Sequence, residues 1–425
     1  MKLFPHQQAA LDQTAGQNRV AYYLDMGLGK TFVGSEKMMQ LGGRVNLVIC
    51  QKSKIDDWMQ HFCNVYGFSC CTFDLTGKQG FDGFVWELTK CPKDFRMKLI
   101  IGIINYDLIF RRQELSKIKI DTIMLDESSL IQNEQSKRSR FILNKLQHEN
   151  CILLSGTPTG GKYERLWSQC KLLGWGISKT AYWNTYVEYH FDAFMSAFPL
   201  KIIDGYKNID RLKKKLREHG AVFMKSDEVF DLPDQIFTDL TIAASKEYRT
   251  FQKKSILSFD GREFIGDSTL TKLLYSRMLC GYANAAKVKA FSDLVDSTDD
   301  RLIVFYNFVN ELEALRAAVG DRPVSVVSGD EKDLTAYENS ENSVTFIQYQ
   351  AGAMGLNLQK ANKIVYFTPP LSSELFEQSK KRTHRIGQAR TCYYYRMICR
   401  NSVEEKIYKT LEMRQDFTER LFENG

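Results

Sequence analysis

The sequence predicts an α/β protein of two tandem lobes, each a mainly parallel β-sheet flanked by helices, with short helical insertions. Short apolar runs with strand character alternate with amphipathic helical stretches, a pattern typical of βα units. A second series of such runs follows a break at residues 231–234, where proline and acidic residues interrupt the pattern. The length of 425 residues is also too great for one compact core.

The predicted strands fix the two lobes, which we place at residues 1–228 and 229–425. An insertion at about 165–223 is aromatic and basic, with helical spacing in YWNTYVEYHFDAF (182–194). Its aromatic stripe reads as core material, with a base-stacking platform as the alternative. The predicted strands are 20–24, 45–49, 99–104, 122–125 and 151–154 in the first lobe, and 302–306, 324–327, 344–347 and 363–367 in the second.

Composition excludes several classes of protein. Hydrophobic residues make up 44% and charged residues 26%, as in soluble globular proteins. We find no apolar run long enough to span a membrane and no secretory signal at the N-terminus. The ten cysteines contain no C-x-x-C pair, which favours a reduced, intracellular setting. The net charge of +7 is mild, but clusters such as 211–217 favour a polyanionic partner.

The stretch LDMGLGKT (24–31) follows the strand-like run AYYL and precedes a helical stretch. This strand–loop–helix context is the one that a phosphate-binding P-loop requires, although Leu24 stands where the first glycine usually lies. Glycines allow backbone amides to close around phosphate, the lysine reaches the β- and γ-phosphates, and the threonine binds Mg²⁺. A plain turn is the alternative. The candidate residues are Gly27, Leu28, Gly29, Lys30 and Thr31.

Two carboxylates end the strand-like run TIML, at Asp126 and Glu127. Asp126 can hold Mg²⁺, and Glu127 can polarise the water that attacks the γ-phosphate. An Asp-Glu pair is also common at a helix N-terminus, but its place about a hundred residues after a P-loop favours catalysis. A further strand ends in LLSGTPT (153–159), which is either an ST-turn or a sensor that couples the nucleotide site to movement.

Basic residues gather in QSKKRTHRIGQ (378–388). Arg382 and Arg385 are three residues apart and share one face if the stretch is helical. Two guanidinium groups on one face can clamp a triphosphate as arginine fingers. A solvated basic helix is the alternative.

These stretches together resemble the Snf2 group of superfamily 2 helicase-like motors, with the motifs in family order. LFPHQ (3–7) resembles the adenine-binding segment, DMGLGKT motif I, LDESS motif II and LLSGTP motif III. Residues 47–50 with Trp58 resemble motif Ia, 104–106 motif Ib, 302–305 motif IV, and QAGAMGLNL (350–358) motif V. RTHRIGQ (382–388) is the most Snf2-like feature.

The resemblance implies two RecA-like lobes and further site residues. It implies that Gln7 and Gly355 contact the nucleotide, and that a C-terminal helix at about 402–423 braces the lobes. The alternative is that this helix packs on lobe two only. The resemblance also implies DNA backbone contacts at Asn105, Tyr106, Gly352 and Asn357.

Two departures from the family pattern concern coupling and DNA contact. Ser128-Ser129 stands in motif II where the family has alanine and histidine, so coupling through that histidine must be remade, with His384 as a candidate. Residues 348–350 are QYQ where the family shows Ser-Thr-Arg, which removes one expected DNA contact.

The resemblance implies a DNA-dependent ATPase that uses ATP and Mg²⁺ to translocate on double-stranded DNA, through phosphates and without strand separation or sequence preference. A strand-separating DNA or RNA helicase is one alternative, and a nucleotide-gated DNA clamp with little hydrolysis is another. We expect a monomer inside a bacterial or phage-infected cell.

Overall fold

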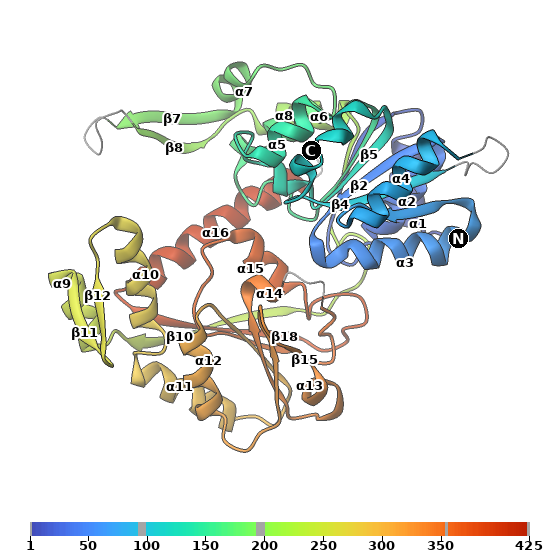
Figure 1. Ribbon diagram of the computed structural model, residues 1–425. Coiled ribbons are helices and arrows are strands. Elements are labelled where there is room, and N and C mark those ends of the chain that lie inside the picture. Colours follow the sequence, from blue (N-terminus) through green and yellow to red (C-terminus); the bar gives the residue numbers. More distant parts are fainter. Residues whose placement is uncertain (1, 92–98, 193–199, 353–355, 423–425) are drawn as a thin grey trace. The chain divides into compact units, whose positions relative to one another are not determined.

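A computed structural model describes the protein at every position except 1, 92–98, 193–199, 353–355 and 423–425. The chain forms two compact units: unit 1 holds residues 1–229 and 417–425, and unit 2 holds residues 230–416. Each unit is built on one seven-stranded sheet (Figure 1), so the predicted two-lobe α/β architecture is confirmed. Among the described residues, no helix combines the length and apolar character needed to cross a bilayer.

Unit 1 contains an all-parallel sheet with the strand order β3-β4-β2-β5-β6-β1-β9. Its central strands are mainly apolar, and every residue of β2 is buried, as expected of a sheet covered on both faces. The strands are β1 (Arg19–Leu24), β2 (Val45–Cys50), β3 (Cys71–Asp74), β4 (Ile100–Asn105), β5 (Ile120–Asp126), β6 (His148–Leu154) and β9 (Ala221–Met224).

Helices connect these strands, so the carboxyl ends of all seven strands meet at one edge of the sheet, where α/β proteins place their ligand sites. The helices of unit 1 are α1 (Pro5–Gln13), α2 (Lys30–Leu41), α3 (Ile55–Tyr66), α4 (Lys78–Thr89), α5 (Lys137–Asn144), α6 (Trp167–Leu172), α7 (Lys179–Tyr186) and α8 (Ile209–Glu218).

Unit 2 contains a sheet with the order β10-β18-β17-β13-β16-β14-β15, parallel except for the β14–β15 pair. Ile303 and Phe305 of β13 belong to one apolar cluster, and Leu302 and Val304 belong to another, so both faces of this strand are buried. The strands are β10 (Gln235–Ala243), β13 (Leu302–Tyr306), β14 (Val324–Val327), β15 (Lys332–Asp333), β16 (Val344–Gln348), β17 (Lys363–Tyr366) and β18 (Cys392–Arg400).

The helices of unit 2 are α9 (Lys246–Lys254), α10 (Thr269–Cys280), α11 (Ala285–Asp296), α12 (Val309–Ala318), α13 (Thr335–Asn339), α14 (Tyr349–Gly352) and α15 (Ser373–Lys380). Helix α16 (Val403–Phe422) begins in unit 2, and its residues from 417 onward belong to unit 1. An antiparallel hairpin of β11 (Ile256–Phe259) and β12 (Arg262–Ile265) lies between α9 and α10. Helix α16 begins one residue after the start predicted for the C-terminal helix.

The predicted helical insertion is only partly helical. Tyr182 and Tyr186 lie on α7 and are buried in the core of unit 1, as the core interpretation expects, but Phe191 of the same stripe is exposed. From Val187 onward the chain instead forms a hairpin of β7 (Val187–Asp192) and β8 (Leu200–Tyr206), which extends away from the body of unit 1 (Figure 1). The β-branched Val187 and the alternating aromatic residues after it favour a strand, although their spacing also fits a helix. Pairing with β8 makes the segment a strand.

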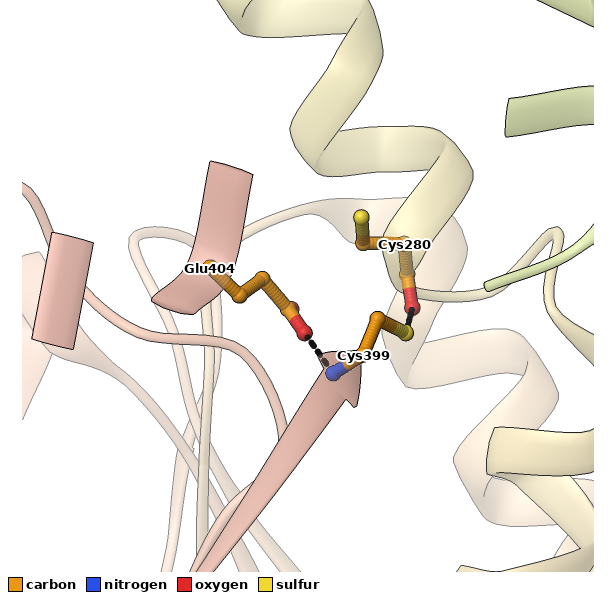
Figure 2. Close-up of side chains that lie close together, drawn as sticks. All are labelled: Cys280, Cys399 and Glu404. Carbon is orange, nitrogen blue, oxygen red and sulfur yellow. Dashed lines mark hydrogen bonds between the residues drawn. The ribbon is translucent and has the colours of Figure 1, made fainter. Parts of the chain in front are cut away.

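A thiol–carboxylate cluster lies in the interior of unit 2. The end of α10, the end of β18 and the start of α16 bring Cys280, Cys399 and Glu404 together (Figure 2). Lys287 of α11 lies beside them, with its Nζ 2.7 and 2.8 Å from the two carboxylate oxygens of Glu404. Glu404 Oε2 also accepts the backbone N–H of Cys399 at 2.8 Å. The carboxylate is therefore neutralised by a buried ion pair within the protein.

Glu311 forms a second buried acidic site in unit 2, at the start of α12. Its Oε2 accepts the backbone N–H groups of Asn307 and Phe308 at 2.8 and 3.1 Å and the hydroxyl of Thr368 at 3.0 Å. Burial nevertheless raises the pKa of Glu311 to about 7, against the three hydrogen bonds and the charge of Lys287.

The raised pKa predicts a stability that falls with rising pH. The folded protein holds this proton up to about pH 7 whereas the unfolded chain loses it near 4.5, so the protonated form stabilises the fold at low pH and this is lost as pH rises between the two values. A shift of this size corresponds to about 3 kcal/mol, at about 1.4 kcal/mol per unit. We expect Glu311→Gln to flatten the decline in urea midpoint between pH 5 and pH 8, measured by far-UV circular dichroism. An equally steep decline in the variant would contradict the assignment.

Candidate active site

The loop between β1 and α2 has the geometry of a phosphate cradle. Gly27 and Gly29 have φ angles of 91° and 76°, a left-handed conformation that glycine adopts without steric cost. A Cβ added to Gly29 would lie 2.2 Å from Gln7 Nε2, so the Gln7 carboxamide would have to move to admit a side chain. The loop leads directly into α2, whose first backbone N–H groups and dipole favour an anion. These residues fit the phosphates of a nucleotide.

Lys30 is the first residue of α2, directly after this loop. Its Nζ donates to the carbonyl oxygens of Leu24 at 3.0 Å and Asp25 at 3.4 Å. A Cβ added to Gly156 would lie 3.3 Å from the same Nζ. The structure thus brings the predicted motif I lysine beside the predicted motif III loop, and a side chain at Gly156 would crowd it.

Gln7 and His6 bind the phosphate loop from α1. Gln7 Nε2 donates to the carbonyl of Leu28 at 3.1 Å, and His6 Nε2 lies 3.0 Å from the same oxygen. Gln7 Oε1 accepts the backbone N–H of Phe4 at 3.0 Å. The carboxamide of Gln7 therefore supports the loop, and its contact with adenine stays a prediction.

The predicted pair of carboxylates follows at the carboxyl end of β5. Asp126 Oδ2 accepts the indole N–H of Trp58, from α3, at 2.9 Å. Burial raises the pKa of the Asp126 carboxyl, while the Trp58 hydrogen bond and the charge of Lys30 act against this. A half-buried carboxylate oriented by one donor near a lysine suits Mg²⁺, which prefers one or two carboxylates together with phosphate oxygens. Thr31, in the first turn of α2, is the second predicted ligand.

Glu127 has a φ of 54°, unusual for a residue with a side chain. Ser155, the first residue after β6, donates its hydroxyl to Glu127 Oε2 at 3.4 Å and accepts the backbone N–H of Thr157 at 3.1 Å. The predicted motif II and motif III are therefore linked by hydrogen bonds through this serine.

Asn105 and Tyr106 do not present the surface expected of DNA contacts. They are 4% and 2% exposed, and the Tyr106 hydroxyl donates to the backbone oxygens of Asp126 at 2.9 Å and Glu127 at 3.4 Å. Asn105 is the last residue of β4 and Tyr106 follows it, and both side chains are enclosed by the interior of unit 1. Tyr106 instead supports the backbone that carries the two carboxylates.

The serine pair in motif II is buried and has a partner that the sequence analysis missed. Ser128 donates to Gln169 Oε1, from α6, at 2.8 Å. His384, the candidate replacement for the family histidine, lies in unit 2 with its Nε2 2.8 Å from the carbonyl of Pro233. Gln169 lies outside every predicted motif, so no pattern in the sequence marks it.

Comparison with known families agrees with this geometry. A family model described as the SNF2-related domain matches residues 23–281, and the helicase conserved C-terminal domain matches residues 286–387. The chain belongs to the SNF2-related family. The predicted Snf2 resemblance is thereby confirmed.

Relatives of this SNF2-related chain share about a quarter of its residues where they align. The candidate ATP-dependent helicase/translocase YwqA of Bacillus subtilis is 25% identical over 348 residues, covering 73% of this chain and 37% of YwqA. The ISWI chromatin-remodelling complex ATPase ISW1 of Saccharomyces cerevisiae is 25% identical over 454 residues, covering 94% of this chain and 39% of ISW1. The chain thus spans less than half the length of these relatives.

Among solved structures, the SWI2/SNF2 ATPase core of Sulfolobus solfataricus in complex with dsDNA is 19% identical. It has a TM-score of 0.45 and covers 99% of this chain and 92% of that chain.

The SNF2-type RTHRIGQ stretch differs from its prediction in one respect. Helix α15 ends at Lys380, so Arg382 and Arg385 lie in turns and do not share a helical face. The hydroxyl of Thr383 donates to the carbonyl of Lys380 at 3.4 Å, at the end of the helix, and Gly387 follows in a left-handed conformation with a φ of 93°. Arg382 is 2% exposed, and burial lowers the pKa of the half-buried Arg385 guanidinium.

The neighbouring motif V residues lie in the same unit. The backbone oxygen of Arg382 accepts the N–H of Leu358 at 3.0 Å, which joins the two motifs. Asn357 is exposed and Gly352 ends α14. Gly355 lies outside the described residues.

Proposed function

We propose that this chain hydrolyses ATP and uses the energy to translocate along double-stranded DNA without separating the strands. One observation carries the proposal: Lys30, Asp126, Glu127 and Ser155 converge at the carboxyl edge of the unit 1 sheet. A phosphate cradle, a carboxylate suited to Mg²⁺ and a second carboxylate suited to a general base are the parts that phosphoryl transfer to water requires.

Each residue has a role in this proposal. The amides of residues 27–31 and Lys30 bind the phosphates, Thr31 and Asp126 hold Mg²⁺, and Glu127 accepts the proton of the attacking water. Bound Mg²⁺ would neutralise charge on the phosphate oxygens. Arg382 and Arg385 of unit 2 stabilise the charge that develops in the transition state, and Gln7 and Gly355 contact the nucleotide.

Duplex DNA is the proposed track. The family match and the helicase/translocase relative support a motor on nucleic acid. A groove of about 400 Å³ on unit 1 is lined by Lys137, Arg140 and Lys145, a charge that suits phosphates. Contacts to phosphates carry no sequence information, so we propose binding without sequence preference. Asn357 and Gly352 remain proposed DNA contacts in unit 2.

The direct test is ATP turnover by the purified chain with no nucleic acid, single-stranded DNA, duplex DNA or duplex RNA. We expect strong stimulation by duplex DNA. Lys30→Ala should remove it, whereas Lys119→Ala should not, because Lys119 is 73% exposed and pairs with the surface residue Glu149.

The other outcomes assign other functions. Stimulation by single strands alone would favour a strand-separating helicase. Tight ATP-dependent DNA binding without turnover would indicate a nucleotide-gated clamp. In the duplex case, displacement of a triplex-forming strand without separation of the duplex would support translocation, and light scattering would test the proposed monomer.

A further inference from the structure

Gln169 lies in the interior of unit 1, on α6, with an exposed fraction of 0%. Its Oε1 accepts the hydroxyls of Tyr23 at 3.0 Å and Ser128 at 2.8 Å. Its Nε2 donates to the carbonyl oxygen of Pro158 at 2.8 Å. The Pro158 carbonyl can only accept, so it fixes which end of the carboxamide faces it.

The three partners of Gln169 come from the three segments that build the candidate active site. Tyr23 precedes the phosphate loop by one residue of β1, Ser128 follows Glu127, and Pro158 belongs to the LLSGTP loop. Gln132 also donates to the Pro158 carbonyl, at 3.4 Å, so the loop is bound twice to the segment after Glu127. One buried side chain therefore joins motif II, motif III and the strand that ends at motif I.

Glu127 gives this junction a mechanical consequence. A residue with a side chain at a φ of 54° is strained, and such a conformation persists only where its surroundings hold it. Ser128, the next residue, is held by Gln169. If the Pro158 loop moves, either the buried Gln169 bonds break, leaving unsatisfied polar groups, or the segment at Glu127 moves with it.

We propose that Gln169 is the positioning residue that couples the LLSGTP loop to Glu127, and so takes over the coupling that the family assigns to the histidine replaced by Ser129. This inference rests on the proposed function. It places the connection within unit 1, through a residue that belongs to no recognised motif. Gln169 is fully buried, so its effect passes through its hydrogen bonds to Ser128 and Pro158.

Two single-hydroxyl variants make a matched pair for the test. Ser128→Ala and Tyr23→Phe each remove one donor to the same Gln169 oxygen, but only Ser128 leads to Glu127. We expect Ser128→Ala and Gln169→Leu to lower DNA-stimulated kcat about tenfold with little change in KM for ATP, consistent with loss of a buried hydrogen bond. Tyr23→Phe should keep most of the stimulation. The double variant Ser128→Ala/Gln169→Leu should be no worse than Gln169→Leu alone.

A second readout does not depend on turnover. The backbone N–H of Leu130 donates to the carbonyl of Glu127 at 3.0 Å, so hydrogen exchange in peptides spanning 127–132 reports how firmly this segment is held. We expect exchange there to rise about tenfold in Ser128→Ala and Gln169→Leu and to stay near wild type in Tyr23→Phe.

The outcomes are distinguishable. An unstimulated wild type would overturn the proposed function, while unchanged exchange and stimulation in both Gln169→Leu and Ser128→Ala would overturn the role of Gln169 alone. An equal loss in Tyr23→Phe would also overturn it, because the glutamine would then only support the core. Tryptophan fluorescence, which reports unit 1, checks that each variant folds.

Discussion

Replacing Glu127 by glutamine is expected to lower kcat for ATP hydrolysis by about 10²–10⁴-fold, the usual contribution of a general base. The amide keeps the shape of the side chain but cannot take a proton from water. Lys30 and the glycine loop are untouched, so ATP affinity, measured with a fluorescent ATP analogue, should change little. Turnover at saturating ATP, Mg²⁺ and duplex DNA is the measurement.

Glu149→Gln is the matched control for this variant. Glu149 also lies in unit 1, but it is 60% exposed and pairs with Lys119 at the surface. Its replacement should leave turnover near that of the wild type. If Glu127→Gln kept turnover similar to that of the control, another group would have to activate the water, and the proposed role of Glu127 would be withdrawn.

The parts of this site that the sequence predicted are the local ones. The phosphate loop is recognisable because strand, glycines, lysine and helix follow one another within residues 19–41. Asp126 and Glu127 are recognisable because they directly end an apolar strand. Residues that are neighbours in the sequence stay neighbours in the folded protein, so such a motif can be recognised from the sequence alone.

Gln169 could not be predicted because its partners are distant in the chain. Tyr23 is 146 residues away and Ser128 is 41 residues away. They meet only because the sheet order sets β1, β5 and β6 next to one another, an order that the strand pattern alone does not give. The hydrogen bond from Trp58 to Asp126 spans 68 residues and was missed for the same reason.

Errors in secondary structure also have a physical source. The edge strand β10 was missed because its residues are mostly exposed and polar residues interrupt the apolar ones, so it lacks the continuous apolar run of a central strand. In the RTHRIGQ stretch, helical spacing of the two arginines was taken for a helix. A spacing of three residues is compatible with a helix but does not require one. The chain there follows turns instead, and Gln388 holds it by donating its Nε2 to the carbonyl of Ala361 at 2.8 Å.

The ion pair of Lys287 and Glu404 should dominate the stability of unit 2. Both side chains are fully buried, at 0% and 1% exposure. Burial alone would lower the pKa of Lys287, but the carboxylate of Glu404 raises it, so the ammonium stays charged. Removing one partner of a buried pair leaves an uncompensated charge, and we expect Glu404→Gln or Lys287→Met to destabilise the fold by about 3–5 kcal/mol.

The position of the tryptophans separates the two units in this experiment. All five tryptophans lie between residues 58 and 183, within unit 1. Loss of the buried pair should therefore lower the urea midpoint seen by far-UV circular dichroism before any change in tryptophan fluorescence. The double variant Lys287→Met/Glu404→Gln should recover part of the loss, because no unpaired charge remains.

Asp293→Asn supplies the control on the same helix. Lys289 and Asp293 of α11 form an ion pair at 3.1 Å with both side chains more than 60% exposed, and water screens such a pair. Its loss should shift the midpoint far less than Glu404→Gln. Equal shifts in the two variants would show that the cluster around Glu404 in Figure 2 is hydrated in solution and adds no special stability. A large difference would establish that this charge pair joins α11 to the start of α16, and that unit 2 depends on it.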